Sequence, residues 1–159
     1  LKVNSRKVLS AVLRQAGVPD ESFAETCVII DKLDKIGADS VREELAKKVG
    51  LADEVGRRIV EATGAGSLAE FAELAGVTGS EEVQELERLF GLAEDYGYAE
   101  WLQFDASVVR GLAYYTGVVF EGFDRAGRLR AVCGGGRYDR LLSLYGSAQE
   151  VPCVGFGFG

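Results

Sequence analysis

Residues 117–139 decide the fold and read GVVFEGFDRAGRLRAVCGGGRYD. Two runs in this stretch, GVVFEGFD (117–124) and LRAVCGG (129–135), are rich in β-branched and aromatic residues, which favour strands. Between them lies DRAG (124–127), a sequence typical of a turn. We therefore predict an antiparallel hairpin here.

Strand-like sequence continues on both sides of the hairpin. WLQFD (101–105) precedes it, and VPCVGFGFG (151–159) follows a short predicted helix within RYDRLLSLYG (137–146). Glycine occupies every second position from Gly155, so one face of the last strand has no side chains. A bare face of this kind allows another group to approach the backbone closely.

The preceding part of the chain has the spacing of amphipathic helices. After a short strand in LKVN (1–4), apolar residues recur three and four positions apart, and glycines separate the segments. Ser67 and Glu70 form a predicted capping box at the start of one helix. These short segments predict a small helical bundle.

The change of pattern near residue 97 predicts the domain organisation. We expect an α+β protein with three parts: a strand and helix at 1–16, a helical insertion at 17–97, and an antiparallel sheet at 98–159. The 159 residues contain no methionine, and both ends of the sequence are strand-like. We interpret the chain as a piece of a longer protein, cut within a domain at both ends.

Missing residue types exclude several kinds of site. The chain has no histidine, which excludes Ser-His-Asp and Cys-His catalysis and His-ligated zinc within it. Its three cysteines are far apart and contain no CxxC, so we expect buried thiols in a reducing compartment and no metal site. No apolar run of about 18 residues is present, so no membrane span is predicted.

The net charge of −7 is unevenly distributed. Residues 1–97 hold 12 basic and 19 acidic side chains, whereas residues 98–159 hold six of each. All six basic residues of the second part are arginine. Arginine binds phosphate and carboxylate through its planar fork, so this set suits anion recognition; compositional bias explains it equally well.

Three glycine-marked segments fall on successive predicted elements: RGLAYYTG (110–117), CGGGRYD (133–139) and GFGFG (155–159). In an antiparallel sheet they can be neighbours, forming a floor of bare backbone for a small or planar ligand with an anionic part. Alone, CGGGRYD could equally be a bulge or a tight turn. It is neither a P-loop nor a dinucleotide fingerprint, because no GK[ST] follows and no βαβ unit surrounds it.

These motifs closely resemble those of the histidyl-tRNA synthetase family. The resemblance is carried by VVRGLAYYTGVVFEGFD (108–124), AVCGGGRYDRLL (131–142) and VPCVGFGFG, and more weakly by KVNSRKVL (2–9) and CVIIDKLDKI (27–36). It is closest to the cyanobacterial and plant-organelle type. It implies part of a class II synthetase antiparallel sheet, interrupted by an all-helical insertion domain.

The resemblance also implies an activity for the full-length protein. The family activates histidine with ATP, in the presence of Mg²⁺, to histidyl-adenylate and then transfers the histidyl group to tRNA(His). Its members work as homodimers and not at a membrane. The compartment would be the cytoplasm, or a chloroplast or mitochondrion in a plant or alga. Because the family's motifs 1 and 2 and its anticodon-binding domain are missing, we expect these 159 residues alone to be inactive.

On matching positions, the resemblance implies a role for each site residue. Arg110 would be catalytic and would contact the α-phosphate. Tyr114 and Tyr115 would belong to the histidine pocket, one lining it and the other packing, with the assignment left open. Ala113 departs from the aspartate common at that position, which leaves any role of a carboxylate there in doubt.

The resemblance also implies further contacts to histidine, to ATP or the adenylate, and to tRNA. Histidine would lie on Gly134, Gly135 and Gly136, with Tyr138 as either a pocket residue or a structural anchor. ATP or the adenylate would contact Arg137, Gly155 and Gly157. The weak candidates for tRNA contact are Lys47, Lys48, Arg57 and Arg58, which could equally be ordinary solvated side chains.

Two other functions remain open. A non-catalytic relative, serving as a regulatory subunit of ATP phosphoribosyltransferase or as a tRNA-sensing domain, would share the motifs without the chemistry. Without the resemblance, the residues indicate an α+β module that binds a small anion.

Overall fold

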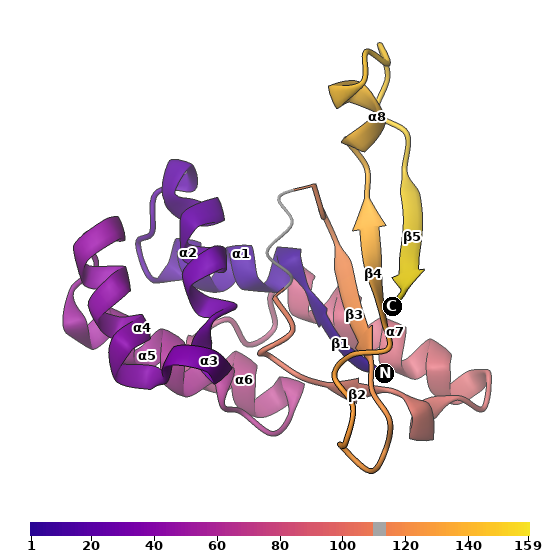
Figure 1. Ribbon diagram of the computed structural model, residues 1–159, viewed down its shortest axis with the longest axis horizontal. Helices are drawn as coiled ribbons and strands as arrows, with labels where there is room; N and C mark the ends of the chain where they lie inside the picture. Colours follow the sequence, from indigo (N-terminus) through magenta and orange to yellow (C-terminus); the bar gives the residue numbers. More distant parts are fainter. Residues whose placement is uncertain (110–113) are drawn as a thin grey trace.

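The computed structural model describes residues 1–109 and 114–159, which form an α+β fold (Figure 1). Its strands are β1 (Lys2–Ser5), β2 (Gln103–Phe104), β3 (Val118–Gly122), β4 (Cys133–Tyr138) and β5 (Cys153–Phe158). Its α-helices are α1 (Arg6–Gln15), α2 (Phe23–Ile30), α3 (Leu33–Ile36), α4 (Ala38–Glu44), α5 (Asp53–Thr63), α6 (Leu68–Ala75), α7 (Glu81–Asp95) and α8 (Leu141–Leu144). Three single turns complete it: η1 (Asp20–Ser22), η2 (Leu45–Val49) and η3 (Ala99–Trp101).

The five strands form one sheet in the order β2-β1-β3-β4-β5. The predicted hairpin of β3 and β4 is confirmed, with Val119 opposite Gly136 and Glu121 opposite Gly134. The expectation of a purely antiparallel sheet is wrong at one edge, because β1 and β2 are parallel. The helices between them return the chain to the end of the sheet where β1 begins, so β2 enters in the same direction.

The turn between β3 and β4 forms where the sequence predicts it. The Gly127 N–H donates to the Asp124 carbonyl at 3.0 Å, and the Asp124 carboxylate accepts from the Leu129 N–H at 2.9 Å. Gly127 has a φ of 64°, a conformation that glycine adopts without strain.

Side-chain caps define the helix starts that matter for the sheet. Ser5 ends β1 and its hydroxyl accepts from the Lys7 N–H, so α1 follows the strand directly. One half of the predicted capping box is also present: Ser67 Oγ accepts from the Glu70 N–H at 3.2 Å. The Glu70 carboxylate accepts in turn from the Gly66 N–H, one residue before the cap.

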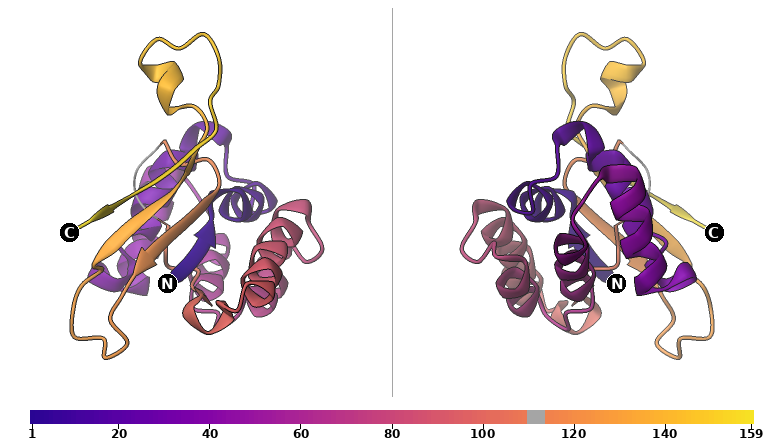
Figure 2. Two further views of the ribbon diagram at one scale, coloured as in Figure 1. Left: turned by 90° about the vertical axis from the view of Figure 1, so that its right-hand side faces the viewer. Right: turned by 90° about the vertical axis from the view of Figure 1, so that its left-hand side faces the viewer.

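Helices and sheet share one buried cluster. Val3 of β1 and Phe104 of β2 pack with Val8 of α1, Phe71 of α6 and Leu86 of α7. The rings of Phe71 and Phe104 lie 5.5 Å apart between centroids. Figure 2 shows helices α1 to α7 gathered beside the β1 and β3 part of the sheet, away from β5. The packing of these helices therefore holds the sheet in place at β1 and β2.

Strands β4 and β5 extend away from this core, with α8 at the tip of their connection (Figures 1 and 2). In the described chain β5 pairs only with β4, and its side chains Val154, Phe156 and Phe158 are exposed. Within residues 1–109 and 114–159, no helix has the length and apolar character of a membrane span.

Candidate functional site

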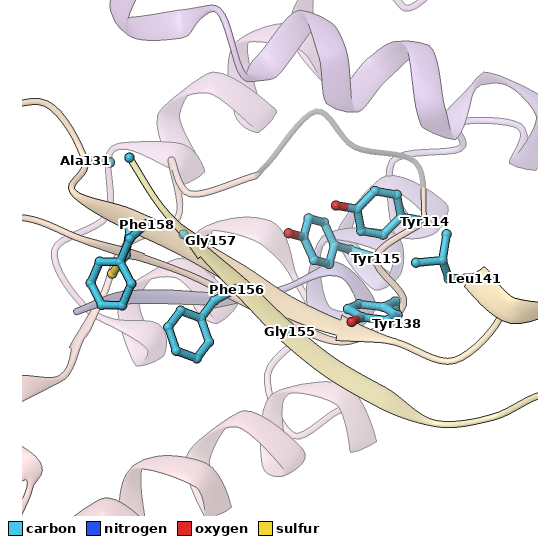
Figure 3. Close-up of a pocket in the computed structure, with 12 residues that line it drawn as sticks. Tyr114, Tyr115, Ala131, Tyr138, Leu141, Gly155, Phe156, Gly157 and Phe158 are labelled. Carbon is cyan, nitrogen blue, oxygen red and sulfur yellow. The ribbon is translucent and has the colours of Figure 1, made fainter.

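Three tyrosines gather above the β4 and β5 strands (Figure 3). Tyr114 and Tyr115 lie in the segment that leads into β3, and Tyr138 ends β4. The rings of Tyr114 and Tyr115 are 4.6 Å apart between centroids, and the Tyr138 ring meets Tyr114 edge-on at 5.7 Å. All three hydroxyl groups point the same way. Tyr114 and Tyr115 can lie on the same side of the sheet because they precede β3, so the alternation of side chains along a strand does not apply to them.

The tyrosines border a hollow of about 570 Å³ on this side of the sheet. Bare backbone of β4 and β5 forms much of its surface. The described residues that line it are Tyr114, Tyr115, Ala131, Cys133, Gly134, Tyr138, Leu141, Gly155, Phe156, Gly157, Phe158 and Gly159. None of these is an acid, lysine or arginine, so this part of the site can bind a polar ring by stacking and hydrogen bonding.

The structure divides the tyrosine pair as the sequence could not. Tyr115 is buried, with 6% of its surface exposed, and packs with Val108 and Val119. Tyr114 is half-buried at the edge of the same cluster. Both rings nevertheless line the hollow. Tyr115 is thus the anchored ring of the wall, and Tyr114 is the more accessible one.

The three glycines of β4 face different surroundings. Gly134 lines the hollow. Gly136 lies beneath Tyr115, and a β-carbon there would stand 2.9 Å from Tyr115 Cδ1 and 2.6 Å from the Val118 carbonyl oxygen. Gly135 points to the opposite face, where a β-carbon would overlap Phe156. Strand alternation therefore places Gly134 and Gly136 on the face of the hollow, where Gly136 lies under the Tyr115 ring, and Gly135 on the opposite face.

The glycines of β5 fit the bare face that the sequence predicts. Gly155 and Gly157 both line the hollow, opposite Gly136 and Gly134 respectively. The Tyr138 ring covers Gly155 so closely that a β-carbon would overlap the tyrosine hydroxyl. Tyr138 thus borders the hollow and also packs on the neighbouring strand.

Of the two predicted arginines, the structure describes Arg137. Arg137 alternates with Tyr138 on β4 and so points to the opposite face, where its Nε donates to the Asp139 carboxylate at 2.9 Å. It does not line the hollow. Arg110, for which a catalytic role is expected, lies outside the described residues.

The four basic residues proposed for RNA contact lie on η2 and α5, within the helical part. Lys47 pairs with Glu43 and Lys48 with Glu44, each one helical turn away. Arg57 pairs with both Glu54 and Glu61. Arg58 lies beside Gly76. These neighbouring carboxylates offset much of the local positive charge.

Sequence reasoning missed Thr116 and Asp139. The Thr116 hydroxyl donates to Asp139 Oδ2 at 2.7 Å, although the two residues are 23 positions apart. The pKa of Asp139 lies below its ordinary value, chiefly because of this hydrogen bond, with Arg137 adding to the effect. Each residue stands in a quoted motif, but nothing in the sequence indicates that they meet.

Metal-binding side chains do not cluster in the described ranges, 1–109 and 114–159: no three Cys, Asp or Glu residues are placed to share an ion. The three cysteines are free thiols; the expectation of buried thiols is confirmed for Cys27 and wrong for Cys133 and Cys153, which are half-buried.

Comparison with known proteins gives a consistent family. The family model described as histidyl-tRNA synthetase matches residues 1–159. The chain is 52% identical over 158 residues to the chloroplastic/mitochondrial histidine–tRNA ligase of Arabidopsis thaliana. It resembles the crystal structure of histidyl-tRNA synthetase from Nostoc sp. PCC 7120, with a TM-score of 0.84, 29% identity and 99% of this chain and 39% of that chain covered.

A second solved structure is similar and has a double description. It is an ATP phosphoribosyltransferase regulatory subunit/histidyl-tRNA synthetase from Bacillus halodurans, with a TM-score of 0.76 and 26% identity over 99% of this chain and 41% of that chain. The chain covers 99% of its own length but only 32% of the Arabidopsis relative, so it spans about a third of the relatives that it matches.

Proposed function

Since the chain belongs to the histidyl-tRNA synthetase family, we propose that the full-length protein is a histidine–tRNA ligase. It joins histidine to ATP, forming histidyl-adenylate and releasing pyrophosphate, and then transfers the histidyl group to tRNA(His). ATP, with Mg²⁺, is a substrate. The full-length protein acts as a homodimer, in the cytoplasm or in a chloroplast or mitochondrion.

The observation that supports this proposal is the tyrosine wall over bare strands. In this proposal, histidine lies in the hollow beside Tyr114, Tyr115 and Tyr138, with its backbone end over the glycines. A phenol can exchange a hydrogen bond with an imidazole nitrogen. An amino acid without that partner would leave the buried phenol unsatisfied, which is an effective basis for rejection.

The glycines and arginines take separate parts in the proposal. Gly134 lies under histidine, Gly136 seats Tyr115, and Gly135 allows β4 to pack closely against β5. Gly155 and Gly157 border the adenylate. Arg110 stabilises the charge on the α-phosphate during attack by the histidine carboxylate. The position of Arg137 on the far face does not support its expected adenylate contact.

We propose that residues 17–97 form an insertion domain between the sheet parts at 1–16 and 98–159, placed against tRNA. Lys47, Lys48, Arg57 and Arg58 are its candidate contacts. Each phosphate contact adds to the salt dependence of nucleic-acid binding. Replacing Lys47 and Lys48 by glutamate should therefore reduce the slope of the tRNA KM against salt; an unchanged slope would remove them as candidates.

The principal test is histidine-dependent exchange of pyrophosphate into ATP by the full-length protein. We expect exchange by the wild type, none by Arg110→Ala, and retained histidine binding by that variant. Arg125→Ala, in the β3–β4 turn, is the matched control and should keep activity. The isolated 159 residues should show no exchange.

The similarity to the Bacillus halodurans structure, which is described as a regulatory subunit or a synthetase, supports a regulatory role as the second candidate function. A regulatory relative would bind histidine but catalyse no exchange, even as the full-length wild type. That result would replace the ligase proposal by the regulatory one.

A further inference from the structure

The segment that carries the two tyrosines is attached to the end of β4 by hydrogen bonds of Thr116 with Asp139 and with Arg137. Thr116 Oγ1 donates to Asp139 Oδ2 at 2.7 Å, and the Asp139 N–H donates back to Thr116 Oγ1 at 3.1 Å. A third hydrogen bond runs from the Thr116 N–H to the Arg137 carbonyl at 2.9 Å. All three place residue 116 against the end of β4.

The Asp139 carboxylate is itself held in place. Its second oxygen, Oδ1, accepts from Arg137 Nε at 2.9 Å, so both carboxylate oxygens have a partner. The aliphatic part of Arg137 also packs on Gly117, where a β-carbon would lie 3.0 Å from Arg137 Cδ. The end of β4 therefore presents an oriented, charged acceptor to the threonine hydroxyl.

The position of this segment decides where the tyrosine rings lie. Thr116 directly follows Tyr115, whose ring rests on the bare backbone of Gly136 with almost no spare room. A small displacement of the segment would lift that ring from Gly136 and move Tyr114 with it, since the two rings are 4.6 Å apart. Ligand recognition is sensitive to displacements of this size.

From these contacts we infer that Thr116 and Asp139 are positioning residues for amino-acid binding: their hydrogen bonds hold the Tyr114–Tyr115 wall over the glycine strands. Neither side chain lines the hollow, so they act through the tyrosines. The inference rests on the proposed histidine site and adds to it a determinant of amino-acid affinity that is separate from ATP binding.

The test uses pyrophosphate exchange by the full-length protein, measured against histidine and against ATP. Thr116→Val keeps the shape but removes the hydroxyl, and should raise the KM for histidine about tenfold, as expected for loss of a hydrogen bond to a charged group. The KM for ATP should change less than about twofold. Thr116→Ser restores the hydroxyl and should return the KM for histidine to near the wild-type value.

Asp139→Ala removes the carboxylate that accepts from the Thr116 hydroxyl. The double variant with Thr116→Val should raise the KM for histidine no more than the larger single effect, because both changes remove the same hydrogen bond. Thr63→Val is the matched control: the Thr63 hydroxyl donates only to the Val60 carbonyl within α5, and its loss should leave the KM for histidine unchanged.

The outcomes separate this inference from the proposed function. Absence of exchange by the wild type would contradict the ligase proposal. An active wild type with a Thr116→Val variant of unchanged histidine KM would overturn the positioning role. So would a parallel loss of histidine and ATP affinity that Thr116→Ser does not rescue, because this pattern indicates general damage to the fold.

Discussion

The ring of Tyr138 lies directly over Gly155, so that its hydroxyl occupies the space that a side chain at position 155 would need. The two residues sit on adjacent strands, with Tyr138 opposite Cys153. An aromatic ring here replaces the packing that a glycine in a strand otherwise lacks. At Gly155, the surface of the hollow therefore has no side chain of its own, and the Tyr138 ring packs against its backbone.

Gly155→Ala should destabilise the protein by about 1–3 kcal/mol, because its β-carbon meets the Tyr138 ring and hydroxyl. Adding Tyr138→Phe removes the hydroxyl and should recover part of that loss. Gly157→Ala is the matched control on the same strand: a β-carbon there has nothing within 4 Å, so its effect on stability should be within about 0.5 kcal/mol. Urea unfolding of Gly155→Ala, of Tyr138→Phe alone, of the double variant and of Gly157→Ala measures the coupling between positions 138 and 155, and additive single effects would contradict the contact.

Phe71→Ala should be among the costliest substitutions in the helical part. The Phe71 side chain is 1% exposed and packs against Phe104 of β2, so its removal leaves a cavity between α6 and the sheet. The expected loss is about 3–5 kcal/mol in the free energy of unfolding. Leu74→Ala, on the exposed side of the same helix, is the control and should cost much less. Equal losses would show that α6 does not anchor the sheet.

Asp105 should make stability depend on acid pH. Burial acts to raise its pKa, but hydrogen bonds from Lys2 and Ser107 outweigh burial and hold the pKa below the ordinary value. A lowered pKa in the folded state means that the stabilisation is complete above about pH 4, the unfolded value, and is lost as pH falls through the lower folded value. Asp105→Asn should thus be less stable than wild type at pH 6, with the gap narrowing near pH 3. A gap independent of pH would exclude this ionisation as the cause.

Cys27 should be inert to alkylation in the folded protein. Burial raises the pKa of its thiol to about 11, so very little thiolate is present near pH 8, and the sulfur is also inaccessible. In a Cys133→Ser/Cys153→Ser variant, iodoacetamide should modify Cys27 only after denaturant is added. Rapid modification without denaturant would show that the α1–α2 region opens readily.

Local sequence was enough to predict the hairpin, because its signals lie within 23 residues: β-branched runs around Asp124–Gly127 (residues 117–139). The cap of α6 was predictable for the same reason, since Ser67 and Glu70 are one turn apart. The parallel pairing of β1 with β2 was not, because almost 100 residues separate them and the direction of β2 depends on the path of all the helices. A local pattern indicates a strand but not its neighbour.

In the candidate site, too, some features were predictable from local sequence and others depended on segments far apart in the chain. The sequence by itself determined that bare strands and tyrosines would come together, because alternating glycines and adjacent aromatic residues restrict what a sheet can pack. Only the tertiary structure decided that both Tyr114 and Tyr115 face one hollow, that Arg137 turns away from it, and that Thr116 meets Asp139. The reason is physical: these outcomes depend on the distances between segments far apart in the chain, and side-chain periodicity carries no information about those distances.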